Sequence, residues 1–94
     1  MNVRTVRHKG LRQMVQENDL KAIRPDMVSR LRNILSALLS AESMVDLNGP
    51  PGWRVHQLTG HRAGTWSISV TGNWRLTFLL DGLDLCDMDL EDYH

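Results

Sequence analysis

The chain has 94 residues and a single cysteine, Cys86, which excludes an internal disulfide and indicates a reducing compartment. A chain of this length buries roughly 60–70% of its unfolded surface, so we expect one modest core and a single domain over residues 1–94. The sequence begins without the apolar stretch of a signal peptide, and no apolar run is long enough to cross a bilayer. We therefore expect a cytoplasmic protein with no membrane contact.

The net charge is zero at neutral pH, but the charges are unevenly distributed. Residues 1–47 hold eight Lys and Arg against five Asp and Glu, a net +3, whereas residues 48–94 hold three against six, a net −3. A nucleic-acid-binding protein usually shows a larger basic excess. The composition therefore argues against a long phosphate-binding stripe and leaves room for a compact basic patch in the first half.

The first half of the sequence has helical periodicity. Residues 3–6 predict a short first strand, and residues 8–18 predict a short amphipathic helix. Pro25 and Asp26 open a stronger helix, because proline suits the first helical turn. Apolar residues of this second helix recur at helical spacing and form one stripe, made of Met27, Leu31, Ile34, Leu35 and Leu38.

From Asn48 onward the periodicity changes to that of strands. Turn signals recur about every ten residues, near residues 49–52, 60–64, 72–73 and 81–82, which is the spacing of an antiparallel meander. The last two signals, Gly72-Asn73 and Asp81-Gly82, each suit a two-residue hairpin that needs positive φ angles. Apolar residues alternate between the turns, at Trp66, Ile68, Val70, Trp74, Leu76, Phe78, Leu80, Cys86, Met88 and Leu90.

Helices followed by strands predict an α+β fold. We expect two N-terminal helices packed on one face of a four- to five-stranded, mainly antiparallel sheet, in which the N-terminal strand is the optional fifth. The three tryptophans are expected to fill the core. The opposite face of the sheet should be a polar concavity that can hold a substrate, lined by Ser67, Ser69, Arg75, Thr77, Asp87 and Asp89.

The strand region carries side chains suited to phosphodiester chemistry. His56 lies on the first meander strand, Arg75 lies on the third, and the sequence closes with Asp92-Tyr93-His94. Imidazole titrates near neutral pH, and a guanidinium is a permanently charged fork that fits phosphate oxygens. Two imidazoles and one guanidinium would serve to break a phosphodiester without a metal.

Each of these residues also has a plain structural interpretation. His56 on its own is a surface histidine of a polar sheet face, and Arg75 is a cross-strand partner for Asp87 or Asp89. The acidic run over residues 84–92 indicates a solvated edge strand rather than a metal cluster, because its alternation spreads the carboxylates over both faces. The histidines lack the second pair of ligands that a structural zinc site needs.

Several short motifs occur in an order that resembles one protein family. The motifs are His8-Lys9-Gly10-Leu11, Arg30-Leu31-Arg32 followed by Ile34-Leu35, Asp46-Leu47-Asn48, Pro51-Gly52-Trp53-Arg54 followed by His56, Gly72-Asn73-Trp74-Arg75, and Asp92-Tyr93-His94. Together they cover essentially the whole chain. This pattern resembles the HigB-type toxins, the plasmid maintenance killer branch of the RelE/ParE superfamily.

The resemblance implies a RelE-like fold and a toxin of a type II toxin–antitoxin pair. It implies a ribosome-dependent endoribonuclease that cleaves mRNA in the ribosomal A site and so inhibits translation. The implied partners are a HigA-like helix-turn-helix antitoxin, the ribosome and mRNA, with operator DNA reached only through the antitoxin. No metal or organic cofactor is implied.

The family's functional positions fall on His56, Arg75, Asp92, Tyr93 and His94. In the chemistry that the resemblance implies, the RNA 2′-OH attacks the adjacent phosphate and leaves a 2′,3′-cyclic phosphate. Arg75 would stabilise the phosphorane, while His94 or Asp92 would be the base. His56 would be the acid, with the acid and base roles open to exchange, and Tyr93 would orient the phosphate or stack on a base.

Residues around the first meander strand are expected to contact the RNA backbone, namely Arg54, Thr59, His61 and Arg62. Relatives often carry Lys where this chain has Thr59, so His61 or Arg62 would supply the missing cation. Two other functions fit the same fold. One is a non-catalytic, ParE-like inhibitor of DNA gyrase, and the other is a decayed toxin that serves only as an antitoxin-binding module.

Overall fold

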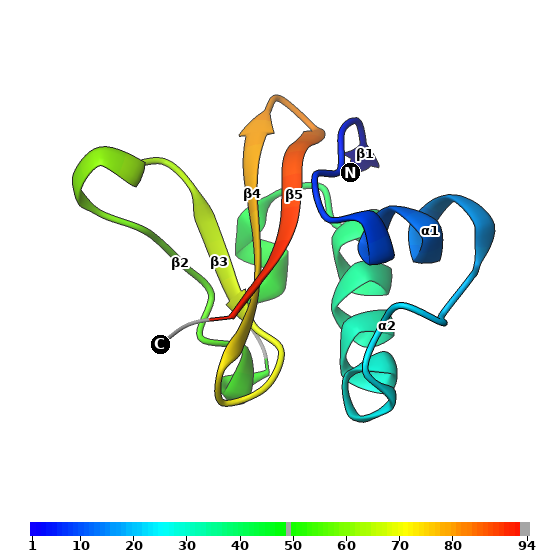
Figure 1. Ribbon diagram of the computed structural model, residues 1–94. Helices are drawn as coiled ribbons and strands as arrows, with labels where there is room; N and C mark the ends of the chain where they lie inside the picture. The colour runs from blue at the N-terminus through cyan, green and yellow to red at the C-terminus, as the bar shows by residue number, and fades with distance from the viewer. Residues whose placement is uncertain (49, 93–94) are drawn as a thin grey trace.

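The computed structural model describes residues 1–48 and 50–92. It consists of a five-stranded sheet with two helices on one side (Figure 1). The prediction of two helices followed by a mainly antiparallel sheet is confirmed. Among the described residues, no helix has the length and apolar character needed to span a membrane. In chain order the elements are β1 Asn2–Val3, α1 Lys9–Glu17, α2 Pro25–Ser40, β2 His56–Gln57, β3 Trp66–Ser69, β4 Trp74–Asp81 and β5 Asp84–Asp92, with the 3₁₀ turns η1 Met44–Leu47, η2 Pro51–Trp53 and η3 Gly60–Arg62.

The two helices follow from their end residues and their apolar stripes. The His8 Nδ1 accepts a hydrogen bond from the Leu11 N–H at 3.0 Å at the start of α1, and Asn18 ends this helix with a left-handed φ of 53°. Helix α2 begins at Pro25. Proline lacks a backbone N–H, but the first residue of a helix would have no intrahelical acceptor for that group, so no hydrogen bond is lost. The whole predicted stripe of α2 is buried, which confirms it, and each such side chain contributes roughly 1.5–3 kcal/mol of burial free energy.

The strand order is β1-β5-β4-β3-β2, with the last four strands antiparallel as predicted. Strand β1 is shorter than predicted and pairs in parallel with β5, and Val6 adds a separate parallel bridge to Met88. Backbone bonds such as Arg4 N–H to Leu85 O, at 2.8 Å, join the two segments. Strand β5 therefore lies between β1 and β4, and the prediction that the acidic run forms an edge strand is wrong.

A bulge in β5 changes which of its residues face the core. Asp87 adopts a φ of 51°, and the pairing with β4 slips by one residue at this position. A bulge sets two residues against one on the partner strand, so the alternation of faces reverses across it. Leu85 and Met88 are therefore both buried, whereas Cys86, which the predicted alternation grouped with Met88 and Leu90, is only half-buried and outside the core, so that part of the prediction is wrong.

The tryptophans lie at the margin of the core. Trp53, Trp66 and Trp74 are half-buried and pack against the core cluster, so the prediction that they fill it is wrong. The centre is occupied instead by smaller apolar side chains and one phenyl ring, with Leu31 and Phe78 almost fully buried. An indole is large and rarely fits completely inside so small a core.

The two predicted hairpin turns have different outcomes. The turn between β4 and β5 has two residues as predicted, but they are Gly82-Leu83 rather than Asp81-Gly82, because Asp81 still belongs to β4; Gly82 has the positive φ of 61° that this turn needs. The turn between β3 and β4 is longer than the two residues predicted, because the last pair before it joins Ser69 to Arg75. Neither difference alters the order of the strands.

Candidate active site

Strand register assembles the polar face of the sheet. His56 on β2 pairs with Ser67 on β3, Ser67 pairs with Thr77 on β4, and Thr77 pairs with Asp89 on β5. Residues directly opposite each other on neighbouring strands project to the same face. His56 therefore lies at one end of a polar row that crosses four strands.

The neighbouring row contains Arg75. Arg75 pairs with Ser69 on one side and with Glu91 on the other. Side chains two residues apart on a strand share a face, so Arg75 projects to the same face as Thr77 and His56. The register also corrects one prediction, because Glu91 stands across from Arg75 in place of Asp87 or Asp89.

A cavity of about 410 Å³ opens on this face. It gathers most of the residues singled out from the sequence: His56, Thr59, His61, Arg62, Arg75 and Asp92. Gln57, Leu58, Thr77 and Glu91 complete its wall. Arg54 precedes the cavity on the chain and is not part of its lining, while Tyr93 and His94 lie outside the described residues.

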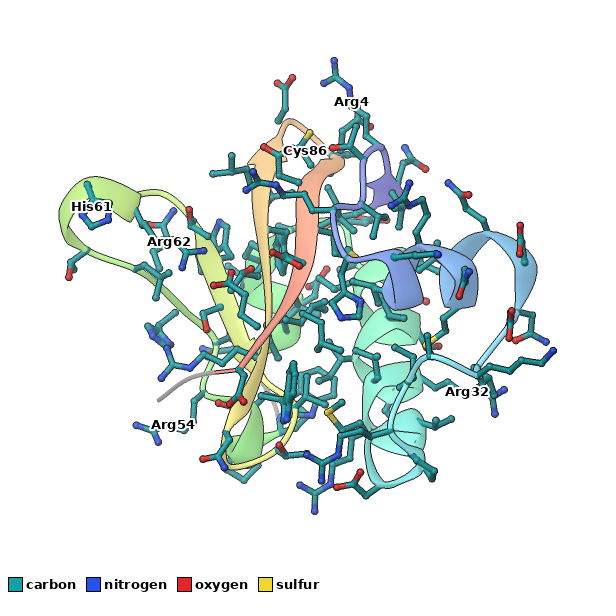
Figure 2. The ribbon with its side chains drawn as sticks, in the orientation of Figure 1. Arg4, Arg32, Arg54, His61, Arg62 and Cys86 are labelled. Atoms are coloured by element: carbon teal, nitrogen blue, oxygen red, sulfur yellow. The ribbon has the colours of Figure 1, made fainter. Side chains whose placement is uncertain are left out.

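The outer wall of the cavity is the connection between β2 and β3, residues 58–65. The Leu58 N–H donates to the Thr65 carbonyl at 2.8 Å across its base, and η3 forms its tip. This connection projects from the sheet on the side away from the helices (Figure 1). Figure 2 shows His61 at the outer end of the connection and Arg62 turned back toward the strands.

A backbone carbonyl orients the His56 ring. The Nδ1 atom of His56 lies 2.7 Å from the carbonyl oxygen of Arg54, which has a left-handed φ of 48° at the end of η2. Because a carbonyl oxygen can only accept, Nδ1 carries the proton in this contact. Nε2 is then the nitrogen that takes up a proton in the neutral ring and donates one in the imidazolium.

Glu91 accepts hydrogen bonds from two side chains of the site. Arg62 donates from Nη1 to Oε1 at 2.9 Å and from Nη2 to Oε2 at 2.7 Å, and the Thr77 hydroxyl donates to Oε2. The Arg62 contacts hold the pKa of Glu91 below its usual range, opposed by burial and aided by Thr77. The same hydrogen bonds raise the pKa of Arg62.

The polar face of the sheet contains a buried hydroxyl. Ser67 is 1% exposed, and among the described residues its Oγ has no hydrogen-bond partner. Such a group loses its hydration without compensation, which disfavours the folded state. Within residues 1–48 and 50–92, no cluster of three His, Cys, Asp or Glu side chains is placed to hold a metal ion.

The sequence prediction missed Glu91 as a site residue, and it did not name Gln57 or Leu58, which also line the cavity. The place of Glu91 in the acidic run suggested one more solvated carboxylate. Strand alternation does put Asp89 and Glu91 on one face, but the pairing with β4 decides that Glu91 stands across from Arg75. No local pattern in the sequence reports that register.

Comparisons with known proteins identify a family. Residues 4–94 match the model of the HigB-like toxins, described as the RelE-like toxin of the type II toxin–antitoxin system HigB. A curated relative, Endoribonuclease HigB of Proteus vulgaris, is 33% identical over 92 residues, which cover 98% of this chain and 99% of that protein.

Solved structures share the fold at low sequence identity. YafQ from E. coli strain BL21(DE3) superposes with a TM-score of 0.61 and 15% identity, over 95% of this chain and 92% of that one. A chain of the YoeB–YefM complex from Staphylococcus aureus gives a TM-score of 0.57 and 15% identity, over 100% and 97%. The chain therefore belongs to the family of HigB-like, RelE-like toxins of type II toxin–antitoxin systems, as its motifs predicted.

Proposed function

We propose that this toxin is a ribosome-dependent endoribonuclease that cleaves mRNA and so stops translation. The observation that carries the proposal is the register that brings His56 and Arg75 to one face, around a cavity that Asp92 also lines. The name of the relative Endoribonuclease HigB supports the nuclease activity. The proposed antitoxin is a HigA-like helix-turn-helix protein. The antitoxin, and not the toxin, would bind the operator DNA.

Arg75 is the proposed ligand of the scissile phosphate. Attack by the 2′-OH creates a phosphorane with additional negative charge on its oxygens. A planar guanidinium contacts two of these oxygens at once, which an ammonium cannot do. A preorganised charge of this kind contributes roughly 10²–10³-fold in rate.

The proposed proton transfers use His56 and a second group. As an imidazolium, His56 Nε2 gives its proton to the departing 5′-oxygen, while Asp92 or His94 accepts the proton of the 2′-OH. The reverse assignment uses the same atoms, because Nε2 of the neutral ring is an acceptor. A positioned acid or base contributes about 10²–10⁴-fold. Tyr93 would orient the phosphate or stack on a base, and no metal is given a role.

Dependence on the ribosome follows from charge. Among the described residues, those that line the cavity include two arginines and two carboxylates, and the net charge of the whole chain is zero. Release of counterions, which drives most binding to free RNA, needs several unpaired cations. We infer that the ribosome supplies the main docking surface, while Arg54, Thr59 and His61 contact the RNA backbone locally.

A translation reaction on a defined mRNA, followed by mapping of the new 5′ ends, tests this proposal. We expect cleavage with ribosomes and a 2′,3′-cyclic phosphate on the upstream fragment. A 2′-deoxynucleotide at the scissile position should block cleavage, whereas the same change one nucleotide downstream should not. A phosphorothioate at the scissile phosphate should slow cleavage equally in Mg²⁺ and Mn²⁺.

Three results would contradict parts of the proposal. Efficient cutting of naked RNA at physiological salt would exclude ribosome dependence. Cleavage that survives the 2′-deoxy substitution would exclude attack by the 2′-OH. Arrest of replication before translation, with intact mRNA, would favour the ParE-like inhibition of gyrase.

A further inference from the structure

Arg62, a predicted contact for the RNA backbone, has a different partner in the structure. Both terminal nitrogens of its guanidinium contact the Glu91 carboxylate, at 2.9 and 2.7 Å. A bidentate pair of this kind has defined geometry and is stronger than a single neutral hydrogen bond. The positive charge of Arg62 is therefore balanced within the protein.

Glu91 is itself held firmly by the sheet. It lies on β5, across from Arg75, and it accepts a hydrogen bond from Thr77, which is 3% exposed. The side chain of Glu91 is 29% exposed and that of Arg62 is 44% exposed. The pair thus joins a rigid, partly buried acceptor to a donor on an exposed segment.

The segment that carries Arg62 has few other anchors in the sheet. Strand β2 consists of two residues, and residues 59–64 are exposed. Arg62 precedes β3, whereas Glu91 is on β5, so the ion pair crosses the polar face over β3 and β4. The two buried polar side chains of the described residues, Ser67 and Thr77, belong to those two strands. The Arg62–Glu91 pair therefore ties the outer wall of the cavity to its floor.

We propose that Glu91 is a positioning residue of the active site and that Arg62 acts through it rather than as a ligand of RNA. Through this pair, Glu91 holds residues 58–65 over the polar face and sets where Thr59 and His61 stand relative to Arg75. The assignment rests on the proposed nuclease function. The structural part of the proposal is that the Arg62–Glu91 ion pair holds residues 58–65 in place, and we call this contact the tether. The tether can be measured without any activity.

Amide hydrogen exchange tests the tether directly. Glu91→Gln keeps the shape of the side chain and removes its charge, and Arg62→Met removes the other partner. Either change should speed exchange at Leu58, Ala63 and Thr65, whose N–H groups donate within this segment. We expect roughly a tenfold increase, as for the loss of one charge-assisted hydrogen bond, and the increase should be largest in this segment, because it opens locally.

A matched control is available at the other end of the sheet. Arg4 donates to Asp81 at 2.9 Å and, like Arg62, joins segments far apart in the chain. Arg4→Met should leave exchange of residues 58–65 unchanged. If Glu91→Gln and Arg62→Met also leave it unchanged, the tether does not exist and the proposal is wrong.

A double-mutant cycle on mRNA cleavage tests the role in activity. If Arg62 acts through Glu91, Glu91→Gln lowers kcat, Glu91→Asp restores part of it, and adding Arg62→Met to Glu91→Gln changes cleavage less than about twofold. If Arg62 binds RNA, Arg62→Met raises KM by a similar factor with or without Glu91, which overturns the proposal. Absence of cleavage by the wild-type protein would instead refute the proposed function, and the exchange experiment would still decide the tether.

Discussion

The two faces of the sheet are formed by alternating residues of the same strands, but they depend on different information. On β4, Leu76 and Phe78 enter the core, while Arg75 and Thr77, one residue away from each, line the site. The apolar face packs against the stripe of α2, and its composition follows from local periodicity. The polar face depends on register across four strands and on one ion pair. Stability and activity should therefore respond to different substitutions along one strand.

Phe78→Ala should produce the largest effect on stability. The ring is 1% exposed, and removing a buried ring leaves a cavity that lowers the free energy of unfolding by about 3–5 kcal/mol. A small domain has only about 5–15 kcal/mol in total. Urea unfolding measures the change, with Leu79→Ala, 39% exposed, as the control. Equal losses for both variants would show that the two faces do not differ as described.

Arg75→Ala should produce the largest effect on activity. We expect cleavage to fall by roughly 10²–10³-fold through loss of phosphorane stabilisation. Arg75→Lys should also cleave slowly, because an ammonium group lacks the two-point geometry of the guanidinium. The free energy of unfolding should change by no more than about 1 kcal/mol. A melting curve beside a growth-arrest assay checks both. Lost stability with full toxicity would mean that Arg75 supports the sheet rather than the reaction.

The Arg62–Glu91 pair should give a smaller, pH-dependent effect. The pKa of Glu91 is lowered first by the Arg62 hydrogen bonds, then by Thr77 and the charge of Arg7; Arg75 stands across from it, and Asp89 shares its face. Because the pKa of Glu91 is lower in the folded protein than its ordinary value near 4.5, the carboxylate stabilises the fold at pH values above 4.5. This stabilisation is lost as the pH falls through the folded-state pKa.

The difference in unfolding free energy between the wild type and Glu91→Gln should thus be constant near neutral pH and disappear at acidic pH. Carboxyl NMR titration of Glu91 gives the folded-state pKa directly. A value at or above that of an ordinary glutamate would show that the pair is absent in solution.

Ser67→Ala should give the smallest effect, and with the opposite sign. Removing a buried hydroxyl that has no partner among the described residues should raise the free energy of unfolding by about 1 kcal/mol. Ser69→Ala, on the same face but half-buried, serves as the control. A loss of stability in Ser67→Ala would reveal a partner for the hydroxyl.

Prediction from the sequence succeeded where a residue's place depends on its neighbours along the chain. The α2 stripe follows from a period of 3.6 residues, and the meander follows from turn residues. It failed where the place depends on pairing. The bulge at Asp87, which has a left-handed backbone conformation, puts Leu85 in the core in place of Cys86. The parallel pairing with β1 makes β5 an internal strand.

The candidate site divides in the same way. The motifs singled out His56, Arg75 and Asp92, and the structure brings them to one cavity, while their chemical roles stay predictions. Glu91 was missed because its importance arises from register with Arg75 and from a side chain on another segment. A carboxylate in an acidic run gives no local sign of either.

The position of β5 has a consequence for how the toxin matures. Strand β1 pairs with residues 84–85, and β4 pairs along nearly the whole of β5. Neither strand therefore has all its hydrogen-bond partners until β5, the last strand of the described chain, is in place. Closing so long a loop costs chain entropy, and contacts distant in sequence form slowly. Until β5 docks, two strands present open edges, and neither Glu91 nor Asp92 stands beside Arg75. Until β5 pairs with β4, the active site that we propose is therefore incomplete, because two of its carboxylates belong to β5.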